Sequence, residues 1–298
     1  MYFCNMTRDK FPVYDIGHLA EFKQDDILIS QFAPYLKIHK NLQHAHKHTF
    51  YHLVFFTEGA GSQTIDFQRF EVKPYQIYFM VPGQVHNWAF EGNVEGYVVN
   101  FSHQFFQSFL LNPDYLEQFP FFSGNANEAV INIEERLRIK IISLFEKLLI
   151  ETSENQRTAL DMIKLLLLEL FILIGRTTIT PQLKQASPYN LTLLKNFKNL
   201  IEKNYINNRL PKDYAELLYI TPNHLNALCN DLLDMSAGEI IRNRVVLEAK
   251  RLLVNPQLGI SEVANHLNFA DNSYFTKFFK KHAGITPEEF RKQFIKQS

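Results

Sequence analysis

The spacing of apolar residues divides the chain into a β-rich N-terminal part and a helical C-terminal part. Between Ile27 and about Phe101, short aromatic and β-branched runs alternate with turn signals such as Val81-Pro82-Gly83. This spacing is typical of an antiparallel sandwich or barrel. From Phe50 to Phe56 both alternating faces are apolar, so we expect this strand to be covered on both sides.

After Glu134 the apolar period becomes helical, and it predicts one helix over the residues that follow and a second from about Arg157 to Gly175. In the second helix five apolar residues recur at heptad spacing: Leu160, Ile163, Leu167, Leu170 and Ile174. Two interpretations are open. The helix covers the barrel and its partner helix, or it forms the seam of a homodimer, which we favour because one partner surface is too small for so apolar a helix. The Pro-containing stretch 176–190 is interpreted as a linker.

Two stretches near the C-terminus, 217–240 and 267–290, repeat one pattern of a short helix, a tight turn and a second helix that begins at a polar cap. Leu225 and Cys229 lie 50 positions before Phe275 and Phe279, whereas Leu218 lies 49 before Leu267, so the second turn has one residue more. Two helix-turn-helix units joined by one helix predict two recognition helices that reach neighbouring major-groove segments of a DNA duplex.

Polar residues stand at the front of both predicted recognition helices, which begin after the caps Thr221 and Asp271. Because Asn can pair with adenine through two hydrogen bonds, Asn223 and Asn226 are the expected base readers. The later basic residues are better placed for the phosphate backbone. The predicted DNA contacts are Asn223, His224, Asn226, Ala227, Asn272, Ser273, Tyr274, Thr276, Lys277, Lys280, Lys281 and Arg291.

The charge distribution is compatible with this prediction but modest. Residues 193–298 carry 15 Lys and Arg against 11 Asp and Glu, a net +4, and residues 1–192 carry a net −4. The first ten residues lack the apolar core of a signal peptide, and apolar runs such as Leu165 to Leu168 are far too short to span a bilayer. We therefore expect a cytoplasmic location and no membrane partner. The two cysteines, Cys4 and Cys229, cannot build a disulfide framework, and neither is expected to be a nucleophile.

Five histidines, at positions 39, 44, 46, 48 and 52, lie within 14 residues, and His86 follows downstream. A metal-binding cupin barrel uses His-x-His, a following Glu and a later His. Here nothing acidic stands between Thr49 and Thr57. Three interpretations stay open for the cluster: structural strand histidines, contacts to an organic effector, or metal ligands. We disfavour the last and predict no metal and no cofactor.

Aromatic residues of the same region could line an apolar pocket that stacks on a sugar or an aromatic compound. Together with three of the histidines they form the candidate effector site: His46, His48, Phe55, Tyr78, His86, Trp88 and Tyr97.

Three C-terminal segments, Ile260 to Phe269, Tyr274 to Lys281 and Gly284 to Arg291, resemble the signature of the AraC/XylS transcription regulators, over about residues 210–294 in all. The resemblance implies that Leu247 to Leu253 belongs to the helix between the two units. It also implies base contacts at Asn223, Asn226, Ala227, Asn272, Ser273, Tyr274 and Lys277.

The first unit departs from the family pattern, because Tyr219 stands where a turn glycine is usual, Ala237 where proline is usual and Ala227 where a basic residue is frequent. The segment from His46 to Tyr51, with Gly59 and Pro82 to His86, resembles the cupin-like sensor domain of the same family, in which a small molecule usually occupies the barrel without metal.

These observations predict an α+β protein of two domains. Residues 1–175 are expected to form a cupin-like barrel (27–101) with a helical hairpin (134–175), and residues 191–298 an all-α, seven-helix domain with two helix-turn-helix units. The expected function is sequence-specific transcription regulation without catalysis, with double-stranded DNA, a small-molecule effector, a second copy of the chain and RNA polymerase as partners. The alternative is a metal-dependent cupin enzyme with a helical appendage, for which the histidine cluster is the best support.

Overall fold

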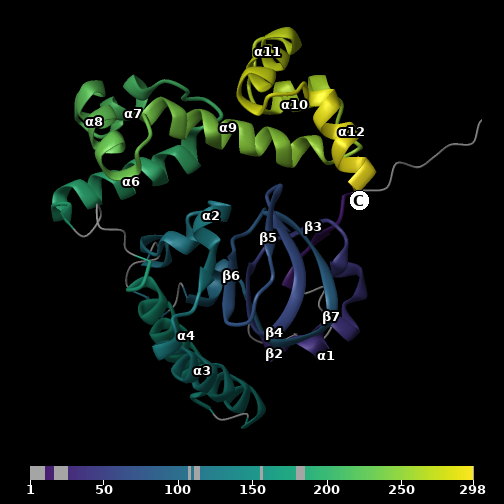
Figure 1. The fold of residues 1–298 in the computed structure, drawn as a ribbon. Helices are drawn as coiled ribbons and strands as arrows, with labels where there is room; N and C mark the ends of the chain where they lie inside the picture. Colours follow the sequence, from purple (N-terminus) through teal and green to yellow (C-terminus); the bar gives the residue numbers. More distant parts are fainter. Residues whose placement is uncertain are drawn as a thin grey trace, which may run out of the picture. The chain divides into compact units, whose positions relative to one another are not determined.

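The computed structural model describes residues 11–16, 26–106, 109–110, 115–154, 157–178 and 185–297. They fall into two compact units, one within residues 12–178 and the other made of residues 185–297 with Phe11 (Figure 1). Cys4 and residues 179–184 of the expected linker lie outside the described residues. No helix in the described part of the chain is long and apolar enough to cross a membrane.

A curled sheet of eight strands forms the centre of the N-terminal unit (Figure 1). Its order is β1-β3-β7-β4-β6-β8, with β2 on β7 and β5 on β4, and all pairs except β1–β3 are antiparallel. The strands are β1 (Val13–Tyr14), β2 (Ile27–Gln31), β3 (His46–His48), β4 (Tyr51–Ile65), β5 (Gln68–Glu71), β6 (Gln76–Met80), β7 (Val85–Phe101) and β8 (Val130–Asn132).

The two longest strands, β4 and β7, pair along most of their length, with register shifts on either side of Glu58. Such irregularities bend a strand and increase its twist. The long strands β4 and β7 can therefore follow the curl of the sheet. Gly96 lies at this place with a φ of 151°, and a Cβ atom there would overlap the carbonyl of Phe55. Only glycine therefore fits at this position, where β7 lies against β4.

Each face of the sheet packs against its own hydrophobic core, as expected from the apolar residues on both faces of the strand at Phe50 to Phe56. Val54, Phe56 and Trp88 belong to the core on the inner side of the curled sheet. Leu53, Phe55 and their neighbours on the other face pack under helices instead. Side chains of a strand alternate between its faces. In this part of β4 the even-numbered residues therefore lie in the inner core and the odd-numbered residues in the outer core.

Short helices surround the sheet, and a pair of long helices covers its outer face. They are α1 (Phe32–Ile38), η2 (Lys40–Gln43), η3 (His103–Phe106), η4 (Tyr115–Gln118), η5 (Pro120–Phe122), α2 (Ala126–Ala129), α3 (Glu135–Glu154) and α4 (Ala159–Gly175). The expected helical hairpin is therefore present as α3 and α4, which pack against each other and join the outer core.

The prediction of a dimer seam on the heptad residues of α4 is wrong. Ile163, Leu167, Leu170 and Ile174 are 0–2% exposed, because they belong to the outer core beneath the sheet and α3, and Leu160 is partly buried against the same core. A residue already covered by its own unit offers no surface to a partner. The apolar side chains of α4 that remain exposed are Met162 and Leu165.

Seven helices form the C-terminal unit within residues 185–297: α6 (Pro188–Asn204), α7 (Pro211–Leu217), α8 (Pro222–Leu233), α9 (Ala237–Leu253), α10 (Ile260–His266), α11 (Asn272–Ala283) and α12 (Pro287–Gln297). Helix α6 begins inside the expected linker, because Pro188 suits a first helical position and Ser187 caps it. Helix α9 contributes to two cores, one with α6 to α8 and one with α10 to α12 (Figure 1). It thereby joins two similar halves.

Candidate functional site

Each half of the C-terminal unit contains a helix-turn-helix, built from α7 and α8 in the first half and from α10 and α11 in the second. Both turns contain a residue in the left-handed conformation, Tyr219 with φ 56° and Asn268 with φ 55°. Asn tolerates this conformation, whereas an aromatic residue rarely adopts it. The turns thus fall at the 49-residue offset predicted from the sequence.

The recognition helices α8 and α11 begin in the same way. The Thr221 hydroxyl accepts a hydrogen bond from the backbone N–H of His224 at 3.1 Å, and the Asp271 carboxylate accepts one from that of Tyr274 at 2.7 Å. Both helices end at left-handed residues 50 positions apart, Asp234 and Gly284. The repeat therefore extends to the caps, which satisfy backbone groups that a helix end leaves unpaired.

Most of the predicted DNA contacts lie on the exposed sides of these two helices. Leu225 and Cys229 of α8, like Phe275 and Phe279 of α11, are 0% exposed and hold the helices to their cores. Thr276 is half-buried. The exposed members of the predicted set are Asn223, His224, Ala227, Asn272, Ser273, Tyr274, Lys277, Lys280 and Lys281.

Two of the predicted contacts have partners within the protein. The Asn226 side-chain oxygen accepts a hydrogen bond from the backbone N–H of Ala237 at 3.1 Å, at the start of α9. The Arg291 Nε donates to the carbonyl of Leu253 at 2.8 Å, at the end of α9. Asn226 is therefore not free to present both its oxygen and its nitrogen to an adenine, and Arg291 ties α12 to α9. The expectation that Asn226 pairs with adenine through two hydrogen bonds is corrected accordingly, and a DNA contact by either side chain stays a prediction.

A groove of about 360 Å³ between the two halves was not foreseen from the sequence. Its lining includes Tyr274, Lys277 and Lys281 of α11 together with Arg242 of α9 and Arg209, which precedes α7. A sequence search confined to the recognition helices misses Arg242, because it stands on the linking helix. The signal that could have revealed it is the set of four basic residues on the linking helix, Arg242, Arg244, Lys250 and Arg251.

Arg209 holds the two halves together. Its guanidinium lies over the Phe269 ring, 3.8 Å from the centroid, and its Nη2 donates to the carbonyl of Leu267 in the second turn. Asn268 of the same turn donates to the side chain of Asn207 at 3.3 Å. Burial lowers the pKa of Arg209 from its usual value, and an arginine remains charged over the whole physiological range. These contacts fix the second helix-turn-helix against the first half.

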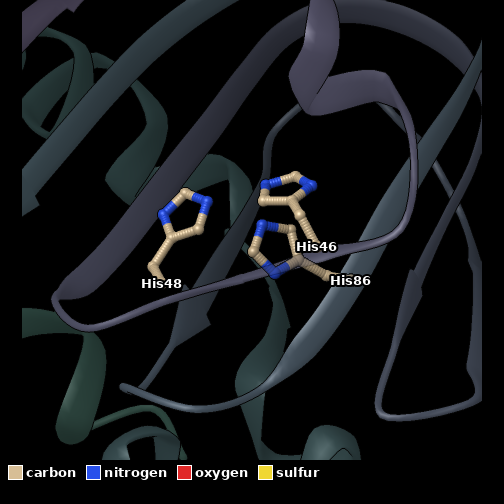
Figure 2. Close-up of side chains that lie close together, drawn as sticks. All are labelled: His46, His48 and His86. Carbon is tan, nitrogen blue, oxygen red and sulfur yellow. The ribbon is translucent and has the colours of Figure 1, made fainter. Parts of the chain in front are cut away.

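In the N-terminal unit four histidines gather on the inner side of the sheet. His46 and His48 of β3, His52 of β4 and His86 of β7 are 0–3% exposed. The rings of His46 and His86 are 4.2 Å apart between centroids, and His48 lies 4.7 Å from each (Figure 2). His46 and His86 are paired residues of adjacent strands, which brings their side chains to one face.

Burial governs the protonation of these imidazoles. Desolvation lowers the pKa of His46 to about 4, against a smaller opposite effect of its hydrogen bond to the His44 carbonyl, and that of His52 to about 3. Burial also lowers the pKa of His48 and His86, and the neighbouring histidines add to the effect. All four rings are therefore neutral near pH 7, and each keeps a nitrogen lone pair.

The predicted effector residues divide between the two faces of the sheet. Tyr78 and Trp88 lie in the inner core near the histidines, and the Trp88 and His46 ring centroids are 6.0 Å apart. Phe55 and Tyr97 lie on the outer face, where both stack on Phe145 of α3 at 5.3 and 5.1 Å. The expectation that these two residues line the barrel is wrong, because both stand at strand positions whose side chains point to the outer face, toward the helices.

Comparison with known proteins matches both units. A family model described as an AraC-like ligand binding domain matches residues 38–171, and one described as a helix-turn-helix domain matches residues 214–293. The chain is 20% identical over 259 residues to the HTH-type transcriptional activator RhaR of Mannheimia succiniciproducens, covering 85% of this chain and 88% of the relative. It is 28% identical over 144 residues to the uncharacterized HTH-type transcriptional regulator YijO of Escherichia coli, covering 48% and 49%. Among solved structures, ToxT from Vibrio cholerae O395 matches with 13% identity and a TM-score of 0.43, covering 89% of this chain and 96% of that one.

Fold, repeat and matches together define a transcription regulator with an N-terminal ligand-binding domain and a C-terminal helix-turn-helix DNA-binding domain. The chain belongs to the AraC/XylS family. The matched relatives are regulators, and the alternative of a cupin enzyme finds no support among them.

Proposed function

We propose that the chain recognises a specific double-stranded DNA site through the fronts of α8 and α11, and that a small molecule in the N-terminal unit changes how strongly it does so. The observation that carries this proposal is the repeated recognition helix: two helices with equivalent side-chain caps, equivalent buried faces and exposed polar fronts, held by one helix, α9. N-terminal residues of such helices are the ones that meet base edges in the major groove.

The contacts divide into two kinds. Asn223, Asn272 and Lys277 carry groups that bond to base edges, so we assign sequence reading to them and to their exposed neighbours. Arg242 and Lys281 line the groove between the halves, where they suit a phosphate of the backbone that runs between two major-groove segments. Phosphate contacts position the protein, whereas base contacts give it specificity.

The effector is proposed to bind on the inner side of the sheet. Support comes from the buried polar groups gathered there. A hollow of about 370 Å³ between α1 and β7, bordered by Leu36, Trp88 and Phe90, shares Trp88 with this region but is not lined by the four histidines. A volume of this size suits a small organic molecule. Binding would act by favouring one arrangement of the chain over another, which requires different affinities in the two arrangements.

We also infer that the chain acts as a cytoplasmic homodimer without catalytic activity and that RNA polymerase is a further partner. One relative is named a transcriptional activator, which motivates the polymerase contact. For the dimer we now assign the seam to a stripe of α4 in which Met162 and Leu165 are exposed and Leu168 and Ile172 are half-buried, and whose members recur every three or four residues.

The test is selection of DNA by the full chain from pooled genomic fragments, with sequencing of what is retained at several salt concentrations. We expect enrichment of a defined site and an affinity that falls steeply with salt. Lys277→Ala and Asn223→Ala should each cost about 1–3 kcal/mol at that site and relax preference at one base position. Lys73→Ala, in the N-terminal unit, is the matched control and should change neither.

Retention that is blind to sequence would refute specific recognition. Unchanged affinity and unchanged preference in both α8 and α11 variants would refute the assignment of these residues while leaving DNA binding itself standing.

A further inference from the structure

We propose that the inner side of the sheet holds one divalent transition-metal ion, of the class of Zn²⁺, coordinated by His46, His48 and His86. This inference deepens the proposed effector site, and only its regulatory consequence rests on the proposed function. It revises the expectation, drawn from the missing cupin glutamate, that the histidine cluster carries no metal.

The backbone brings the three side chains together. His46 and His48 are two residues apart on β3 and so share one face, and His86 is the residue of β7 paired with His46. Their candidate ligand nitrogens all lie within 4.8 Å of one another (Figure 2). In a tetrahedral zinc site with bonds of about 2.0–2.1 Å the nitrogens are about 3.4 Å apart. Side-chain rotations that move each nitrogen by about 1 Å would therefore close the site.

The hydrogen bonds of the histidine rings leave at least one nitrogen of each ring available to bind a metal ion. The Nδ1 of His46 lies 2.6 Å from the His44 carbonyl, and that of His86 lies 3.3 Å from the Gln84 carbonyl. The Nε2 of both rings, and both ring nitrogens of His48, are buried and have no hydrogen-bond partner within the described chain. Metal-binding histidines have this arrangement, in which a carbonyl fixes the tautomer on one nitrogen and the other binds the ion.

The donor set indicates the class of ion. Three imidazoles, without a carboxylate or thiolate among the grouped residues, suit zinc, copper, nickel or iron. Calcium and magnesium prefer oxygen ligands and do not fit.

Three protein ligands leave one coordination position open, as in zinc sites that exchange a ligand. The Nε2 of His52 is also unpaired, but its ring is held by a 2.5 Å hydrogen bond between Nδ1 and Asn100, its centroid lies 5.6 Å from that of His86, and it is not in the group whose nitrogens lie within 4.8 Å of one another. We therefore assign the open position to a small molecule with a nitrogen or oxygen donor. A metal would in this way supply the polar contact that an effector needs inside an otherwise aromatic core.

The experiment uses the full chain without an affinity tag, stripped of metal with a chelator and then titrated with Zn²⁺ in the absence of DNA. Calorimetry gives the affinity, and elemental analysis after dialysis gives the stoichiometry. We expect one zinc ion per chain. His46→Gln and His86→Gln should weaken binding at least about 10–100-fold. His44→Gln is the matched control, because it changes an exposed histidine two residues from a ligand, and it should bind zinc as the unmodified chain does.

Replacement of a buried histidine can also disturb folding, so circular dichroism of the metal-free variants is compared first. Independently of any variant, X-ray absorption of the zinc-loaded unmodified chain should show at least three imidazole nitrogens at about 2.0–2.1 Å. No stoichiometric zinc in the unmodified chain, or equal binding by the chain and both variants, would overturn the proposal. Because DNA is absent, failure of DNA recognition would leave these results unaffected, and the reverse also holds.

Discussion

At the scale of single residues, Tyr219 shows how a departure from a family pattern becomes a physical cost. It holds a left-handed conformation in the first turn, with φ 56°, and its side chain is 96% exposed. The side chain therefore gains little from packing that would offset the strain of a Cβ in this conformation. The equivalent residue of the second turn, Asn268, adopts the same conformation at a lower cost in free energy and donates a hydrogen bond to Asn207.

We predict that Tyr219→Gly raises the free energy of unfolding of the C-terminal unit by about 0.5–1 kcal/mol, because the strain is relieved at the expense of a more flexible unfolded chain. Tyr219→Ala keeps the Cβ and should give no such gain. Denaturation followed by circular dichroism measures the effect. Fluorescence of Trp88, the single tryptophan, reports the N-terminal unit, and its midpoint should not move. Equal stability of the Gly and Ala variants would contradict a backbone origin.

At the scale of elements, α4 shows which part of the fold a sequence can predict. Its length, amphipathic period and pairing with α3 follow from apolar spacing, and so do the caps and turns of the two helix-turn-helix units. The partner of each apolar face cannot be predicted in this way. Periodicity indicates that a face is buried, but it does not indicate which element buries it. The heptad residues of α4 are covered by its own unit.

The same limit explains the mixed outcome at the candidate effector site. Phe55 and His52 are three residues apart on one strand, so they point to opposite faces, and the aromatic character of Phe55 alone could not place it inside. The meeting of His46 with His86 depends on the pairing of β3 with β7, two strands far apart in the sequence. Likewise Asn226 has the side-chain groups of a base reader, but its hydrogen bond to Ala237 arises from the packing of α8 against α9, which the sequence does not reveal.

For α4 we predict that Leu165→Glu dissociates the proposed homodimer, because a carboxylate at this exposed position of the stripe would lose its water on association. Leu165 is 52% exposed, so the fold should tolerate the change. Ile38→Glu makes the same substitution on α1, at a residue that is 58% exposed, and should leave the dimer intact. Sedimentation equilibrium measures the mass. A monomeric unmodified chain, or a Leu165→Glu chain that remains a dimer, would remove α4 as the seam.

At the scale of the whole molecule, the chain is nearly neutral, and the positive charge that DNA requires is concentrated rather than abundant. The C-terminal unit places Arg242, Lys277 and Lys281 around one groove between its two halves. Arg209 borders the same groove but is engaged with the second turn. A small net charge can therefore still give local neutralisation of phosphates, provided that the two halves keep their relative position.

This arrangement predicts different roles for neighbouring basic residues. Arg242→Ala and Lys281→Ala should each reduce the slope of log affinity against log salt by about 0.9, since each removes one phosphate contact and its released counterion, and they should weaken all DNA sequences alike. Lys277→Ala should instead relax base preference. Fluorescence anisotropy with the selected site and a scrambled site, from low to high salt, separates the two effects, and Lys73→Ala serves as the control for loss of a distant charge. If Arg242→Ala and Lys281→Ala left the salt slope unchanged, the groove would lie away from the DNA backbone, and the phosphate contacts would have to come from the recognition helices themselves.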